Sequence, residues 1–120
     1  MSKPFKQFKL DPYNCVLRVY TDREAFEKYT KADTSGMSAA TFRNGWRFAV
    51  FIPANESGAV SIRSAAHEAY HVADWVLEKV EMEYKHNSGN EHIAYLVGHV
   101  CECIAIAADR LAKQKQDAQP

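Results

Sequence analysis

The sequence lacks several features that would assign it to a large class of proteins. Its 120 residues include 15 basic and 15 acidic side chains, so the formal net charge is zero. Bulk charge therefore gives no support for a nucleic-acid or anionic-membrane partner. No apolar run approaches the length of a membrane span. The basic start, residues 1–6, is not followed by an apolar segment, so we do not expect a secretory signal.

Cysteine is also scarce. The three cysteines are an odd number, and Cys101 and Cys103 are too close in sequence to form a useful cross-link. This favours a reducing, cytoplasmic location over a secreted disulfide framework. The chain is too short for a second hydrophobic core and contains no internal repeats. We therefore expect a single domain at residues 1–113, followed by a disordered tail at residues 114–120.

Local patterns predict strands in the first half of the chain. Residues 1–12 are expected to be an irregular lead-in, residues 15–20 a strand, and residues 23–31 a helix capped by Thr21 or Asp22. Asn44-Gly45 lies between two β-prone runs, residues 40–43 and 46–52. This arrangement indicates a hairpin with a type I′ turn.

Two long helices are predicted in the second half. The first is expected to begin after Ser61 or Ser64 and to end at about residue 84, and the second to run from Glu91 to about residue 113. Both have wide apolar surfaces, so much of each helix should be buried. The predicted fold class is α+β, with a small antiparallel sheet that contains a hairpin and packs on the two long helices.

The strongest chemical signal is the stretch His67-Glu68-Ala69-Tyr70-His71 in the first long helix. Four residues are just over one helical turn, so His67 and His71 point the same way, and Glu68 lies about 100° around the axis. Zinc held by two histidines needs a nearby carboxylate to take a proton from water. The spacing therefore predicts a zinc site with Glu68 as the general base.

A third metal ligand is sought on the second long helix. A catalytic zinc site usually takes three protein ligands. Glu91 opens this helix, with 19 residues between it and His71, and is the candidate; His92 and Glu102 are reserve candidates. Ser88 and Glu91 also have the spacing of a capping box, in which the carboxylate satisfies backbone N–H groups. Both roles stay open for Glu91.

Two further side chains are candidates for supporting roles. Tyr95 lies one turn after Glu91 on the same face, where its phenol could donate a hydrogen bond to an oxyanion. A core tyrosine is the alternative. Asp74 lies near His67 on the helical wheel and could orient a ligand imidazole. A surface carboxylate, or one paired with a nearby base, is the alternative for Asp74.

Two motifs of the sequence resemble those of the gluzincin metallopeptidases, thermolysin-like enzymes included: His67-Glu68-Ala69-Tyr70-His71 and Asn90-Glu91-His92-Ile93-Ala94-Tyr95. The resemblance covers about residues 60–105. It is closest to the minimal, one-domain members found among phage and prophage proteins. It implies a zincin-like metal site on the two long helices, with His67, His71 and Glu91 as zinc ligands and Glu68 as the general base.

Two functions are compatible with these patterns. The first is a cytoplasmic zinc-dependent metallopeptidase that acts on a peptide or protein substrate and has no nucleic-acid or membrane partner. The second is a non-catalytic zinc-binding regulatory or interaction protein on the same core. Glu68 favours the enzyme, because a structural zinc site needs no base. An extended peptide substrate could add as a strand to residues 46–52 or to Ala59-Val60.

Overall fold

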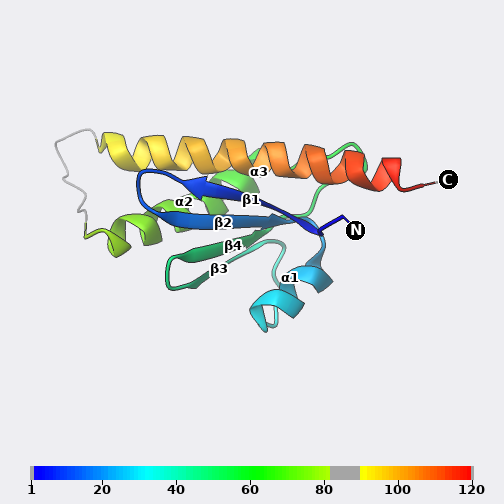
Figure 1. Cartoon of the computed structure of the whole chain (residues 1–120), viewed down its shortest axis with the longest axis horizontal. Coiled ribbons are helices and arrows are strands. Elements are labelled where there is room, and N and C mark those ends of the chain that lie inside the picture. Colours follow the sequence, from blue (N-terminus) through cyan, green and yellow to red (C-terminus); the bar gives the residue numbers. More distant parts are fainter. Residues whose placement is uncertain (1, 82–89, 120) are drawn as a thin grey trace.

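The computed structural model describes residues 2–81 and 90–119. Its elements, in chain order, are β1 (Phe5–Leu10), β2 (Cys15–Tyr20), α1 (Arg23–Thr30), β3 (Ala40–Asn44), β4 (Arg47–Phe51), α2 (Ile62–Lys79) and α3 (Glu91–Asp117). The four strands form one sheet. α2 and α3 cover one face of this sheet and α1 lies against the other (Figure 1). The predicted α+β class is confirmed.

The sheet is mixed, so the prediction of an antiparallel sheet is wrong. Its strand order is β1-β2-β4-β3. β1 pairs with β2 and β3 pairs with β4 as antiparallel hairpins, whereas the central pair, β2 and β4, is parallel. The chain passes from β2 through α1 to the far edge, where it forms β3. β4 then returns beside β2 in the same direction, an arrangement that no local pattern specifies.

The first strand occupies residues that were predicted to be irregular. Phe8 and Leu10 of β1 face the helices, and Leu10 is fully buried. Lys6 and Lys9 interrupt the alternation of apolar and polar residues, so the sequence of β1 does not look like that of a strand. Because β1 is at an edge of the sheet, these lysines are also typical of a strand that must not pair with another chain.

The predicted hairpin is present, and its strands differ from the expected bounds by one residue at most. The predicted type I′ turn is wrong. Asn44 pairs with Arg47, so the two turn residues are Gly45 and Trp46. Of these two, only Gly45 has a positive φ, 63°. A type I′ turn needs positive φ at both positions, whereas type II′ has glycine at the first.

α2 begins at a predicted capping residue. Ser61 Oγ accepts a hydrogen bond from the backbone N–H of Ser64 at 3.2 Å. The helix ends at Lys79, earlier than the predicted end near residue 84, which itself lies outside the described residues. Glu81 adopts a left-handed φ of 58°, a conformation that ends helices.

α3 begins at Glu91 as predicted and continues to Asp117. The expected disordered tail is therefore wrong for residues 114–117, which are helical. Gln114 anchors this end, because its Nε2 donates to the Lys3 carbonyl at 2.8 Å and its Oε1 accepts from Lys6 Nζ at 3.0 Å. Both contacts span more than a hundred residues of sequence and could not be read from local composition.

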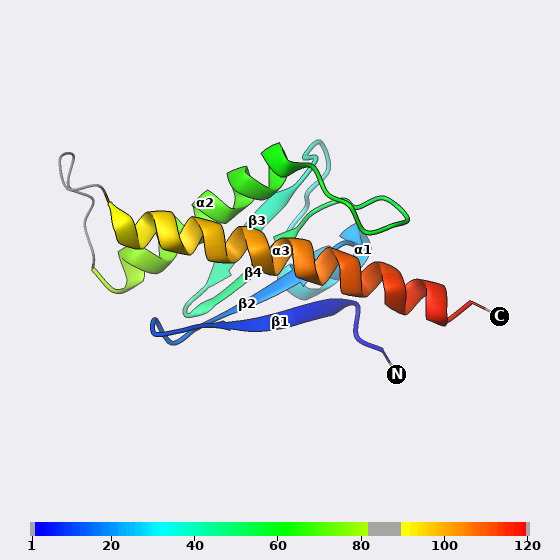
Figure 2. The same ribbon diagram turned by 90° about the horizontal axis from the view of Figure 1, so that it is seen from above.

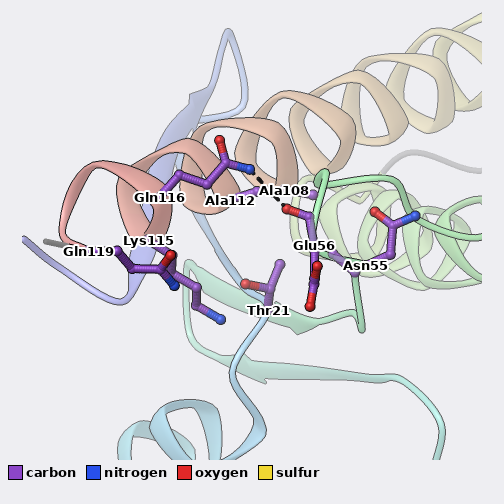
Figure 3. A pocket seen from close by; sticks show the side chains of 9 residues that line it. Thr21, Asn55, Glu56, Ala108, Ala112, Lys115, Gln116 and Gln119 are labelled. Carbon is purple, nitrogen blue, oxygen red and sulfur yellow. Dashed lines mark hydrogen bonds between the residues drawn. The ribbon is translucent and has the colours of Figure 1, made fainter.

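The connection between β4 and α2 packs on the C-terminal half of α3. Gln116 Nε2 donates to the Glu56 carbonyl at 3.2 Å (Figure 3). Gly58 has a φ of +89°, and a Cβ atom added to it would lie 2.8 Å from the Ala108 carbonyl oxygen. This close contact fixes the loop immediately before α2 begins.

α3 also corrects the expectation about membrane spans. Among the described residues it is the one helix that is long and apolar enough to cross a membrane, by length and composition alone. One such helix is weak evidence for a membrane span, because helices in the cores of soluble proteins can have the same length and composition. α3 packs along α2 and against β1 and β2 (Figure 2), and this fold is consistent with a soluble protein.

Candidate metal centre

Three side chains of α2 that can bind a metal ion come together: His67, Glu68 and His71. Their potential ligand atoms all lie within 4.8 Å of one another. The two imidazole Nε2 atoms are 3.2 Å apart. Around a tetrahedral zinc ion with Zn–N bonds of about 2.0–2.1 Å, two ligand nitrogens stand about 3.3–3.4 Å apart. The imidazole pair therefore has nearly the spacing that one shared zinc ion requires.

The carboxylate of Glu68 lies beside the imidazole pair and is withdrawn from solvent. Its side chain is 8% exposed, whereas the His67 side chain is 66% exposed. Glu68 Oε2 is 3.9 Å from His67 Nε2. The His67 imidazole can thus be reached from solvent, while the Glu68 carboxylate beside it is largely buried.

Thr41 holds this carboxylate, and sequence reasoning missed it. Its Oγ1 donates a hydrogen bond to Glu68 Oε1 at 2.8 Å. Thr41 belongs to β3 and pairs with Val50, which is buried against α2 and α3. Residues directly opposite each other in a sheet share a face, so Thr41 also faces the helices. Only the position of β3 at the edge next to α2 reveals this contact.

Trp75 continues the site along α2. Its ring stacks on that of His71, with centroids 6.0 Å apart, and on that of Phe48, at 6.4 Å. The Arg43 guanidinium lies 5.0 Å from the centre of the Trp75 ring, and its Nη1 is 3.3 Å from Glu78 Oε2. Arg43 is also part of β3, so this strand forms a wall along one side of α2.

The structure does not bring the predicted third ligand to the histidine pair. Glu91 is exposed on the first turn of α3, at the end of α2 where Lys79 lies (Figures 1 and 2). His71 is eight residues before Lys79, a rise of about 12 Å along the helix. Glu91 is not part of the cluster of possible ligands. The other half of its capping box, Ser88, lies outside the described residues.

The remaining candidates on α3 also lie outside the cluster. Tyr95 is 75% exposed, so the alternative of a core tyrosine is wrong. His92 is half-buried and Glu102 is exposed, and neither joins the described group of possible ligands. On α2, Asp74 is half-buried, and its role in orienting an imidazole stays a prediction.

The cysteines behave as small apolar residues. Burial raises the pKa of the Cys103 thiol to about 11, and the nearby Glu102 carboxylate adds to this effect. Cys103 Sγ lies 3.8 Å from His99 Nε2. Burial also raises the pKa values of Cys15 and Cys101. These thiols are therefore protonated at neutral pH, which disfavours them as metal ligands.

A separate cavity of about 350 Å³ lies between the C-terminal half of α3 and the loop that follows β4 (Figure 3). It is lined by Thr21, Ala54, Asn55, Glu56, Ala108, Ala112, Lys115, Gln116 and Gln119. None of the predicted site residues is among them. The cavity is therefore distinct from the candidate metal centre.

No family model matches this sequence, and no match was found among the curated proteins or the solved structures. The likeness to gluzincins thus rests on the two sequence motifs. The side chains of His67, Glu68 and His71, from the first motif on α2, lie together. No described side chain of the second motif, on α3, joins them.

Proposed function

We propose that the protein is a zinc-dependent metallopeptidase in which His67 and His71 bind the metal and Glu68 is the general base. The observation that carries this proposal is the 3.2 Å separation of the two Nε2 atoms beside a buried carboxylate. A zinc ion bound there would polarise a carbonyl group and lower the pKa of a water molecule. The gluzincin resemblance implies Glu91 as a third ligand, but Glu91 is not part of the described cluster.

The chain's own residues would handle the proton. Glu68 takes it from the attacking water and passes it to the leaving amine. Thr41 keeps one carboxylate oxygen occupied, so the other, Oε2, is the atom that faces the imidazole pair. Tyr95 remains the candidate donor to the oxyanion, although its place on α3 gives this role no support.

The position of β3 suggests how a peptide could bind. The strand earlier expected to offer a free edge, β4, lies inside the sheet, and Val60 forms only an isolated bridge with Ala54. Among the described residues, β3 pairs with β4 alone and is therefore an edge strand. An extended peptide that adds to this edge would pass Thr41, whose side chain holds Glu68.

A non-catalytic zinc-binding regulatory or interaction protein is the second candidate. The observation that favours it is the absence of any α3 side chain from the described cluster. Both candidates take zinc, and both are proposed for a cytoplasmic protein with a peptide or protein partner and no nucleic-acid or membrane partner. They differ in whether Glu68 performs chemistry.

The deciding experiment compares the wild type with Glu68→Gln. Protein purified without added zinc is analysed for metal, and hydrolysis of a mixed peptide library is followed by mass spectrometry. We expect about one zinc per chain in both proteins and hydrolysis by the wild type only. Less than about half an equivalent of zinc, with no rise after zinc is added, would exclude both candidates. Equal hydrolysis by zinc-loaded Glu68→Gln would exclude the mechanism.

A further inference from the structure

A hollow lies between the turn that joins β3 to β4 and the C-terminal end of α2. Its volume is about 510 Å³, and it is lined by Arg43, Asn44, Gly45, Glu78 and Lys79. Arg43 also lies over Trp75, which stacks on His71. A chain of direct contacts therefore connects this hollow to the imidazole pair.

Two cations in the hollow are positioned by tryptophan rings. The Arg43 guanidinium lies 5.0 Å from the centre of the Trp75 ring, and Lys79 Nζ lies 5.3 Å from that of Trp46. Cation–π contacts of this kind restrict where a long basic side chain can go. Both cationic side chains thus line the same hollow between the β3–β4 turn and α2.

One carboxylate of the protein already occupies this place. Glu78 Oε2 is 3.3 Å from Arg43 Nη1, and the Glu78 side chain is 63% exposed. Exposed ion pairs contribute little to stability, so a competing carboxylate can displace this one at small cost. The arginine fork favours a carboxylate that can accept two parallel hydrogen bonds.

The distance from the imidazole pair corresponds to a few residues of peptide. Glu78 is seven residues after His71 on α2, a rise of about 10 Å. An extended chain covers that distance in about three residues. A peptide lying along the edge of β3 could therefore place one side chain in the hollow while its backbone passes the histidines.

We propose that this hollow is a specificity pocket for an aspartate or glutamate side chain of the substrate, about three residues from the bond that is cleaved. This inference rests on the proposed peptidase function, because only a peptidase would have this peptide as its substrate. Arg43 and Lys79 bind the carboxylate of the peptide, which displaces the Glu78 carboxylate that pairs with Arg43 in the free protein. The substrate class is thus an acidic peptide in extended conformation.

The test measures binding separately from cleavage. Zinc-loaded Glu68→Gln protein is titrated against dye-labelled octapeptide pools, in which one position is fixed as Glu or as Gln and the others are uncharged. Fluorescence anisotropy should show about five- to tenfold tighter binding of one Glu pool than of its Gln counterpart. The preference should weaken as salt is added.

Variants assign the preference to named residues, each made in the Glu68→Gln background. Arg43→Gln should abolish it, and Arg43→Lys should retain part of it. Glu78→Gln should increase affinity for the Glu pool, because the resident carboxylate is gone. Arg47→Gln is the matched control: this exposed arginine follows the same turn but alternates with Phe48, which faces the helices. Thermal melts check that each variant is folded.

The outcomes separate this inference from the proposed function. Equal affinities for the Glu and Gln pools, unchanged by Arg43→Gln, overturn the pocket and leave the peptidase proposal standing. Arg43-dependent binding of a Glu pool, without cleavage of that pool by the zinc-loaded wild type, supports the pocket and overturns the peptidase. Failure of every pool to bind overturns the pocket whatever the protein cleaves.

Discussion

In the described part of the chain, the carboxylate of Glu68 is held by a residue of another element, Thr41 of β3. The Glu68 side chain is 8% exposed and accepts a hydrogen bond from Thr41 Oγ1. A buried carboxylate without a donor is costly, and a hydrogen bond to a charged group contributes about 1.5–3 kcal/mol. Thr41→Val keeps the shape and removes the donor. We expect it to lower the free energy of unfolding by about 1–3 kcal/mol, measured by urea denaturation.

The control for this prediction is Thr41→Ser, which keeps the hydroxyl. Its stability should lie closer to that of the wild type than to that of Thr41→Val. Zinc content should be unchanged in both variants, since Thr41 is not a ligand. If Thr41→Val unfolds at the same urea concentration as the wild type, the hydrogen bond does not hold Glu68 in solution.

The Cys103 thiol makes stability depend on alkaline pH. Burial raises its pKa to about 11, from 9.0 for an exposed thiol. Between these values the unfolded chain has lost the proton and the folded protein still holds it. The unfolded state thus binds fewer protons, and the free energy of unfolding falls as pH rises through this range, by about 1–2 kcal/mol. Chemical denaturation at pH 8, 9, 10 and 11 measures the decline.

Cys103→Ala separates this contribution from every other effect of alkaline pH on stability. The decline in its free energy of unfolding between pH 9 and pH 11 should be shallower than that of the wild type. Parallel declines would mean that the thiol contributes nothing to the alkaline loss of stability.

At the residue scale, the sequence could predict contacts between residues that are close in sequence, and could not predict contacts between residues that are far apart. His67, Glu68 and His71 were found because a spacing of four residues on a helix determines their relative positions. Thr41 was not found, because its contact with Glu68 spans 27 residues and requires the correct edge of the sheet. Glu91 was proposed from a motif, and its distance from His71 depends on how two helices pack.

At the scale of elements, the bounds of β2, of α1 and of the hairpin could be predicted because their signals are local. The parallel pairing of β2 with β4 could not be predicted, since it depends on which strand of the hairpin lies next to β2. The same choice makes β3, and not β4, the free edge beside α2. Strand β1 was not predicted, because its lysines interrupt the alternating apolar pattern that is typical of a strand.

The contact between Gly58 and α3 gives a test at this scale. Gly58 has a φ of +89°, and an added Cβ would lie 2.8 Å from both the Ala108 carbonyl oxygen and Asp109 Cα. These are backbone atoms of a helix and cannot rotate away. Gly58→Ala should therefore lower the free energy of unfolding by about 2–4 kcal/mol, from backbone strain plus displacement of the loop from α3.

The matched control is Gly36→Ala. Gly36 has a similar φ of +85°, but a Cβ added there would meet nothing within 4 Å. This variant should lose only the conformational part, about 1–2 kcal/mol. Urea denaturation measures the free energy of unfolding of both alanine variants. An equal loss of this free energy in the two variants would show that the close contact between Gly58 and α3 does not contribute.

At the scale of the whole molecule, the proposed metal centre takes its ligands either from α2 alone or from both α2 and α3. The described cluster contains α2 residues alone, and Glu91 is not among them. On this geometry, Glu91→Gln should leave zinc affinity unchanged, whereas His71→Ala should lower it on the order of 100-fold. Competition with a chromophoric chelator measures both. A loss for Glu91→Gln as large as that for His71→Ala would instead place the third ligand on α3, as the gluzincin motif implies, and would require the two helices to approach each other when zinc binds.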